Sequence, residues 1–89
     1  MTVFAIIGLS GSEKIGAAVE RLYRGQFFQL GPTQWFVVDN VTTKEVCEKI
    51  GIAQEGNGEA VVLPVTTYWG RAPTQFWEWL ASRLGQPNG

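Results

Sequence analysis

The fold of this chain is decided by the stretch FFQLGPTQWFVV, which occupies residues 27–38. Two runs of aromatic and β-branched residues, 27–30 and 35–38, flank the turn-forming pair Gly31-Pro32. Runs of this kind around a glycine–proline turn are typical of a β-hairpin. The stretch therefore predicts two antiparallel strands that are neighbours in a sheet, and the other elements are placed around them.

A strand and a helix precede the hairpin. The run from Val3 to Leu9 is apolar on both alternating sides, which is typical of a strand that is buried on both faces. A helix is expected from Ser12, the predicted N-cap residue, to Arg24. Gly16 lets this helix sit close to the sheet. Its apolar residues recur at spacings of three and four and form one buried side: Ile15, Ala18, Val19 and Leu22.

A short helix follows the hairpin. Thr42 and Glu45 have the spacing of a capping box, so the helix is expected to begin at Thr42 and to end at Gly51. The segment 54–58 that comes next is polar and rich in glycine, and it is the expected mobile loop. The residues that face inward from this helix are Val46, Cys47 and Ile50.

A further strand and a last helix complete the chain. The strand is expected over residues 60–68, and because Pro64 cannot donate a hydrogen bond to a sheet, it lies at an edge or carries a bulge. The last helix is expected from Pro73 to its end at Gly85. Its predicted apolar side consists of Phe76, Trp77, Leu80, Ala81 and Leu84.

The predicted order of elements is β-α-β-β-α-β-α. Two split βαβ units in this order are typical of the ferredoxin-like arrangement. The expected fold class is therefore α+β, a ferredoxin-like βαββαβ sandwich with an extra C-terminal helix. The usual strand order, 4-1-3-2, has the first strand inside the sheet and the fourth at an edge. With 89 residues the chain has room for one domain, expected over residues 1–85, with a frayed tail at 86–89.

Composition restricts the chemistry of the chain. It has no histidine and one cysteine, which excludes catalytic triads, histidine-containing zinc sites and an internal disulfide. Seven basic and eight acidic residues give a formal net charge of −1, so no basic field attracts nucleic acid. The sequence has no membrane-length apolar run and no signal-peptide n-region. We expect a cytoplasmic protein without cofactor, metal or membrane contact, and nucleic acid is not an expected partner.

Both faces of the predicted sheet are apolar. Neighbouring residues in a strand point to opposite faces, and neither set is polar in the first, third or fourth predicted strand. Two helices cover one face in the ferredoxin-like arrangement, so the other face needs a cover of its own. A second copy of the chain, packed with two-fold symmetry, is the expected cover, and the last helix is the alternative. Val37 or Val38, whichever points outward, is then an interface residue.

A second candidate surface lies near the last helix. Tyr68, Trp69 and Arg71 lie at the end of the edge strand, and residues of these types concentrate binding energy in protein interfaces. Packing of Trp69 under the last helix is the alternative. Trp79 is two residues from Trp77, a rotation of about 200° on a helix, so it is expected to face solvent or a partner. Trp69, Arg71 and Trp79 are the predicted contacts with a protein partner.

The loop after the first strand is a candidate anion site. Its residues are Gly8, Ser10, Gly11, Ser12 and Lys14, and amides at a helix N-terminus attract anions. Their spacing matches neither the P-loop pattern nor the dinucleotide-binding pattern, and a plain turn between strand and helix is the alternative.

Two other patterns favour structural roles. Cys47 has no histidine to activate it and only Lys44 nearby, so a buried, inert thiol is expected. Phe28 and Phe36 occupy sheet positions at which RNA-binding sheets stack bases, but their neighbours are not basic.

The hairpin, the helix cap and the tryptophans together resemble the SinR-like small bacterial proteins. These are distant relatives of the CRISPR-associated adaptation endonucleases and of the VapD ribonucleases. Residues 27–38 look like the aromatic hairpin of that family, and 42–45 look like its helix cap. Trp69 looks like the tryptophan after its strand, and Trp79-Leu80 like its closing pair. The resemblance implies the ferredoxin-like fold and a two-fold dimer.

The metal-binding aspartate of the nuclease relatives is not matched. They place it at the end of the first strand, where this chain has IGLS at residues 7–10. Metal-assisted phosphodiester hydrolysis needs oxygen ligands aimed at the cation. We therefore expect a non-catalytic homodimeric interaction protein with an accessory or inhibitory role, such as an anti-defence protein. A degenerate metal-dependent nuclease that uses Asp39 or Glu13 is the alternative, and a nucleotide-binding module that uses residues 8–14 is a third.

Overall fold

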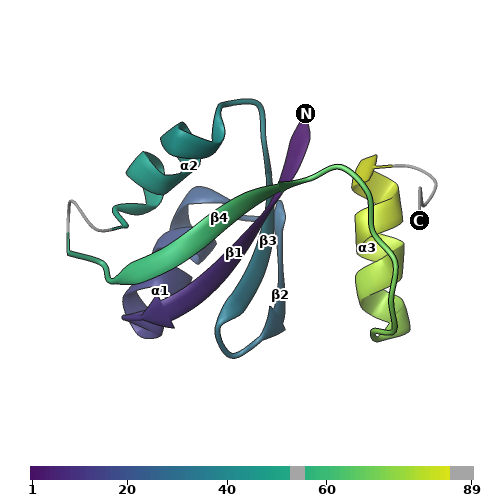
Figure 1. Cartoon of the computed structure of the whole chain (residues 1–89), viewed down its shortest axis with the longest axis horizontal. Coiled ribbons are helices and arrows are strands. Elements are labelled where there is room, and N and C mark those ends of the chain that lie inside the picture. Colours follow the sequence, from purple (N-terminus) through teal and green to yellow (C-terminus); the bar gives the residue numbers. More distant parts are fainter. Residues whose placement is uncertain (53–55, 85–89) are drawn as a thin grey trace.

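The described part of the chain forms an α+β fold in which a four-stranded antiparallel sheet carries three helices (Figure 1). The computed structural model describes residues 1–52 and 56–84. The expected order of elements is confirmed, whereas Gly85, the tail 86–89 and part of the expected mobile loop lie outside the described residues. The elements are β1 (Thr2–Ser10), α1 (Ser12–Leu22), β2 (Phe27–Gly31), β3 (Gln34–Asp39), α2 (Thr43–Ile50), β4 (Glu59–Val65) and α3 (Thr74–Leu84).

The strands lie in the order β2-β3-β1-β4, and every neighbouring pair is antiparallel. The predictions that β1 lies inside the sheet and that the strand with Pro64 lies at an edge are confirmed. β4 ends at Val65 and not at Tyr68, because Val65 already pairs with Val3 near the beginning of β1. Within the described residues, none of the helices has the length and apolar content needed to cross a bilayer.

The ends of the helices agree with the sequence in one case and differ in another. The capping box of α2 is confirmed: Thr42 Oγ1 accepts from the Glu45 amide, and the Glu45 carboxylate accepts from the Thr42 amide. The predicted N-cap Ser12 of α1 is wrong. Gly11 takes that position with φ of 68°, a left-handed conformation that suits glycine.

The helices α1 and α2 pack on one face of the sheet. Trp35 is at the centre of this layer, and ideal Cβ atoms built on Gly8 and Gly16 would lie 3.3 and 3.2 Å from its ring. Because neither Gly8 of β1 nor Gly16 of α1 has a side chain, the Trp35 ring fits against both, and α1 can approach the sheet closely. This close approach is as expected for Gly16. The fully buried strand and helix residues of this core include Phe4, Ile6, Ile15, Val19, Val37, Val46 and Ile50.

The helix α3 packs on the other face, which we call the second face. Phe76 and Leu80 of α3 are buried against Val3 and Val38 of the sheet. Figure 1 shows α3 at one end of the molecule, joined to β4 by the extended connection 66–73. The alternative cover considered from the sequence, the last helix, is thus present, but it occupies one end of the second face.

Candidate functional site

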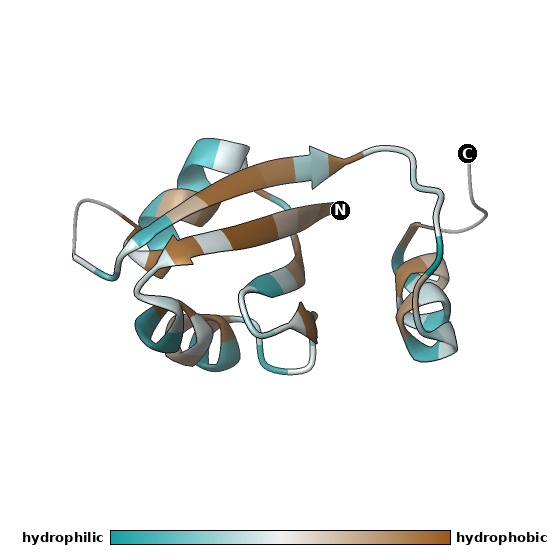
Figure 2. Ribbon diagram, turned by 60° about the horizontal axis from the view of Figure 1, so that its bottom comes forward, coloured by the Kyte–Doolittle hydropathy of each residue, from teal (hydrophilic) through white to brown (hydrophobic). Residues whose placement is uncertain are grey.

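Part of the second face lies beyond the reach of α3, and we call it the exposed strip: Ala5, Ile7, Val61 and Leu63. Ile7 is 38% exposed, Val61 43% and Leu63 47%, and Ala5 is half-buried. The strip is continuous across two strands, because Ile7 pairs with Val61 and Ala5 pairs with Leu63. Figure 2 shows hydrophobic residues along much of the neighbouring strands β1 and β4. Exposed apolar patches of this kind are typical of surfaces that bind another protein.

The free edge of β4 is poorly suited to pairing with a further strand. Pro64 is the next-to-last residue of the strand, between the exposed Leu63 and the half-buried Val65. Proline provides no amide hydrogen, and prolines in edge strands protect natural sheets from edge-to-edge association. Contact with another chain is therefore expected over the face of the strip and not along its edge.

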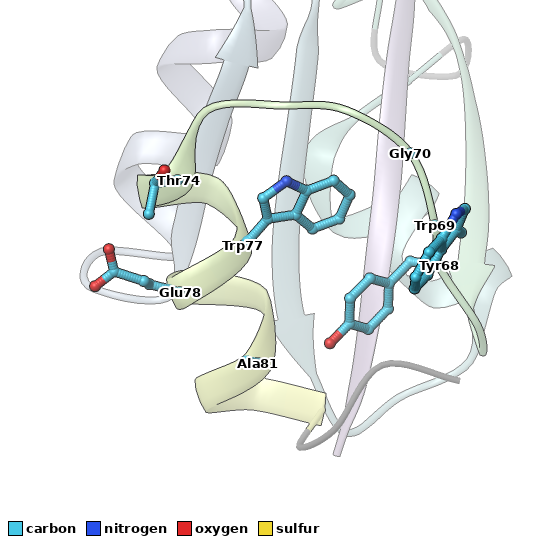
Figure 3. Close-up of a pocket in the computed structure, with 7 residues that line it drawn as sticks. All are labelled: Tyr68, Trp69, Gly70, Thr74, Trp77, Glu78 and Ala81. Atoms are coloured by element: carbon cyan, nitrogen blue, oxygen red, sulfur yellow. The ribbon is translucent and has the colours of Figure 1, made fainter. Parts of the chain in front are cut away.

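A groove lies on the outer side of α3, against the connection that leads into it. Its volume is about 400 Å³, and we call it the aromatic groove. Figure 3 shows Trp77 reaching from α3 toward Tyr68. The Tyr68 and Trp77 rings stack with centroids 5.7 Å apart and 19° between their planes. The lining residues are Tyr68, Trp69, Gly70, Thr74, Trp77, Glu78 and Ala81.

Trp69 is the most exposed large hydrophobic side chain among the described residues, with 82% of its surface open to solvent. The alternative that it packs under the last helix is therefore wrong. Gly70 follows it with φ of 153°, a value that residues with a side chain rarely adopt, and this turns the chain toward α3. Arg71 is exposed nearby but does not line the groove. Of the residues predicted to meet a partner here, the structure brings Trp69 into the groove.

The prediction that Trp79 faces solvent or a partner is wrong. Its ring is half-buried, 5.9 Å from the Phe28 ring, and the Arg83 guanidinium lies 5.2 Å from it. The rotation of about 200° between Trp77 and Trp79 misleads because Trp77 is not at the centre of the buried side of α3 but at one border of it. Counted from the buried Phe76, three residues amount to about 300°, so Trp79 lies about 60° from the centre of the contact on its other border.

The two valines predicted as interface residues both lie inside the molecule. Val37 is fully buried in the layer under α1 and α2. Neighbouring residues of a strand point to opposite faces, and of the two valines Val38 is the one that points to the second face. There α3 covers it. The open part of the second face is formed by β1 and β4 instead.

The candidate anion loop has the geometry of a closed turn. The Ser10 hydroxyl accepts a hydrogen bond from the Glu59 amide at 3.2 Å, which joins the loop to the beginning of β4. An ideal Cβ on Gly11 would lie 2.6 Å from the Asn57 carbonyl oxygen, so the loop packs tightly on its neighbour. The adjacent hollow is lined by the acidic residues Glu13 and Glu20, which repel anions. This arrangement favours the structural alternative over an anion site.

Asp39, the carboxylate considered for catalysis, is held in a network. Its Oδ2 accepts hydrogen bonds from the Tyr23 hydroxyl at 2.8 Å and from Lys49 Nζ at 2.7 Å. Burial alone would raise the pKa of Asp39, but these hydrogen bonds and the one from the Asn40 amide outweigh it and lower that pKa. Burial, with the neighbouring Asp39, raises the pKa of Tyr23. The network joins the ends of α1, β3 and α2, and it escaped the sequence analysis because no local motif connects its members.

The carboxylates considered for a metal site do not meet within one chain. Asp39 pairs with Thr2 at the beginning of β1, whereas Glu13 follows the end of that strand. A nine-residue strand spans about 26 Å, which separates them. Among the described residues, no group of three or more histidine, cysteine, aspartate or glutamate side chains is arranged to hold a metal ion.

Cys47 is half-buried, and burial together with the charge of Glu48 raises the pKa of its thiol. A raised pKa lowers the thiolate fraction, as expected for an unreactive cysteine.

No protein-family model matches the chain, and a search of the curated proteins finds no match. Its function must therefore be argued from the exposed strip and the aromatic groove themselves.

Proposed function

We propose that this chain is a non-catalytic, cytoplasmic interaction domain of the ferredoxin-like type that works as a homodimer and binds a partner protein. Two observations support the fold type: the antiparallel strand order β2-β3-β1-β4, and the position of α1 and α2 on one face. The resemblance to SinR-like proteins belongs to the same proposal, because it implies this fold and a two-fold dimer.

The observation that carries the proposal is the exposed strip. Its cross-strand pairs Ile7–Val61 and Ala5–Leu63 present an uncharged apolar surface next to α3. A two-fold axis through such a strip brings the strip of one protomer onto that of the other. The contact buries apolar surface on both copies, at roughly 25 cal/mol per Å² removed from water. Pro64 at the edge of β4 favours this face-to-face contact over extension of the sheet.

The aromatic groove is the surface we propose for the partner protein. It lies on the outer side of α3, whereas Phe76 and Leu80 on the inner side hold α3 to the sheet. A dimer formed through the strip therefore leaves the groove open. A small chain with a self-association surface and a second binding surface is suited to an accessory or inhibitory role, such as that of an anti-defence protein.

Analytical ultracentrifugation tests the homodimer. The wild-type protein is expected to sediment at about twice the chain mass of 9.8 kDa at micromolar concentration. Leu63→Lys is expected to sediment as a folded monomer, because it places a charge in the strip.

Leu22→Lys is the matched control. Leu22 is also an exposed leucine, at 38%, but it lies on α1 away from the strip. This variant should remain a dimer. A wild-type protein that is monomeric throughout the micromolar range would overturn the proposal.

A further inference from the structure

The two outer strands of the sheet differ in how their free edges are protected. At the β4 edge, Pro64 removes an amide hydrogen. The β2 edge has neither a proline nor a charged residue over Phe27–Gly31, although natural sheets protect their edges with residues of these kinds. Within the described residues no further strand pairs with β2, which Figure 1 shows on the side of the sheet away from β4. The β2 edge is therefore the one at which this sheet can be extended.

The register of the hairpin shows which backbone groups of β2 are available. The Val38 amide donates to the Gln26 carbonyl at 3.1 Å, so the pairs 26–38 and 28–36 are the hydrogen-bonded pairs of the ladder. Phe27 and Gln29 alternate with them and direct their amide and carbonyl groups away from β3. The register shifts after Gln29, and the regular part of the edge ends there. These two residues each offer one donor and one acceptor to an added strand.

A hollow of about 360 Å³ lies beside this edge, on the face that α1 covers, and we call it the acidic hollow. Its charged residues are Glu13 and Glu20. The basic residues of α1 and of the turn after it, Lys14, Arg21 and Arg24, do not belong to its lining. The lining includes Glu13, Gly16, Ala17, Glu20, Gln29 and Trp35.

We propose that the β2 edge binds an extended segment of a partner protein as an added antiparallel strand, with basic side chains of that segment in the acidic hollow. The inference goes beyond the proposed function, because this edge is separate from the exposed strip and from the aromatic groove. In strand addition the main-chain hydrogen bonds give affinity, and alternate side chains give specificity.

The geometry of the ladder determines which residues of the segment are basic. Directly paired residues of antiparallel strands have their side chains on the same face of the sheet. Gln29 lines the acidic hollow, so the residues that bond to Phe27 and Gln29 point toward that hollow. The residues between them point to the second face, where the half-buried Phe28 ring packs with α3. The segment is therefore expected to alternate basic and apolar residues.

A second copy of the chain fits this edge less well. Two-fold pairing of β2 with the β2 of another copy places both α1 helices on the same face of the joined sheet, in opposite directions. Glu13 and Glu20 of one copy are then brought toward the same carboxylates of the other, and like charges repel. A basic segment has the complementary charge.

Nuclear magnetic resonance titration at low ionic strength tests the proposal with three capped seven-residue peptides. Lysine and valine alternate in the first. The second is N-methylated at its lysines and the third at its valines, so that the two have equal charge and equal methylation. The first and third peptides are expected to shift the amide signals of Phe27 and Gln29 in a saturable manner. The second is expected to bind about tenfold more weakly or less, because methylation removes the donors that face β2.

Two results of this titration would overturn the proposal. One is a second peptide that binds as tightly as the third. The other is a first peptide that shifts neither the Phe27 nor the Gln29 signal.

Variants of the protein locate the contact. Gln29→Pro removes one outward amide without breaking a hydrogen bond to β3, so it is expected to fold and to lose most of its affinity for the first peptide. Glu20→Gln is expected to weaken binding by about two- to fivefold, and it keeps the assignment testable if Gln29→Pro does not fold. Glu48→Gln, at an exposed position of α2, is the matched control and should bind as wild type does. A folded Gln29→Pro with wild-type affinity, or equal effects of Glu20→Gln and Glu48→Gln, would show that the β2 edge is not the site.

Sedimentation of the same samples separates this inference from the proposed homodimer. Gln29→Pro is expected to remain a dimer, because Gln29 lies on β2 and the exposed strip lies on β1 and β4. A monomeric wild-type protein that binds the first peptide overturns the dimer and leaves the β2 edge in place. A dimeric protein that binds none of the peptides overturns the β2 edge alone.

Discussion

Replacement of Leu80 by alanine tests whether α3 is a real third layer. The Leu80 side chain is 1% exposed and packs with Phe76, Val3 and Val38. The substitution removes three buried carbon groups, and at about 0.8 kcal/mol each the lost transfer free energy is roughly 2.4 kcal/mol. A cavity between a helix and two strands closes only partly, so the total loss of unfolding free energy is expected to be about 3–4 kcal/mol.

Urea unfolding, followed by tryptophan fluorescence and by circular dichroism, measures this loss. The protein concentration must be fixed, because association adds to the apparent stability. Leu80→Val is measured beside it, since a domain of this size has about 4–13 kcal/mol in total and Leu80→Ala consumes much of it. Gln75→Ala, at an exposed position of the same helix, is the control and should stay within about 0.5 kcal/mol. A loss below about 1 kcal/mol for Leu80→Ala would refute the packing of α3 on the sheet.

Three further predictions concern the rest of the molecule. Asp39→Asn should destabilise the fold by about 1 kcal/mol at neutral pH. Because the pKa of Asp39 is lowered in the folded state, its ionised carboxylate stabilises the fold fully above the unfolded pKa of about 3.9. This stabilisation is lost as the pH falls through the folded-state pKa. Thermal melts between about pH 7 and pH 2 should therefore show a smaller acid-dependent loss of stability for Asp39→Asn than for the wild type. Gly16→Val should lower the free energy of unfolding in urea by about 1–3 kcal/mol, because the new side chain meets the buried Trp35 ring. Ala17→Val, at an exposed position of the same helix, is the control and should lower it far less. Equal losses of stability in the two variants would contradict the close approach of α1 to the sheet. Purified protein incubated with RNA or DNA and Mg²⁺ or Mn²⁺ should leave the nucleic acid intact, and cleavage that Asp39→Asn abolishes would restore the nuclease alternative.

Most of the fold follows from local patterns. The hairpin at 27–38 and the capping box at Thr42 and Glu45 depend on residues that are close in sequence, so their signals are visible without the fold. Pro64 indicates an edge because the missing amide hydrogen is a property of the residue itself. The N-cap of α1 is different: Gly11 is chosen by the tight approach of Asn57, a contact between distant parts of the chain.

The candidate surfaces were predicted less completely than the fold. The types of Tyr68, Trp69 and Arg71 indicated the part of the chain where the aromatic groove lies, and Trp69 is exposed there. The helix side of the groove was missed, although its positions 74, 77, 78 and 81 have the spacing of one helix face. Trp79 was placed wrongly because the direction of a helix face depends on which residue marks its centre, and only the packed structure identifies Phe76 as that residue.

The pairing of β1 with β4 has a consequence for folding kinetics. These strands are the first and the last of the described sheet in chain order, so the second edge of β1 stays unpaired until β4 is in place. Non-local pairing of this kind is slow, and an unpaired strand is exposed to aggregation during the delay. The segment AVVLPV at 60–65 would be a strong aggregation segment without its proline. Pro64 thus acts as a gatekeeper before the native state exists, and Pro64→Val is expected to lower the yield of refolding at high protein concentration more than it changes native stability.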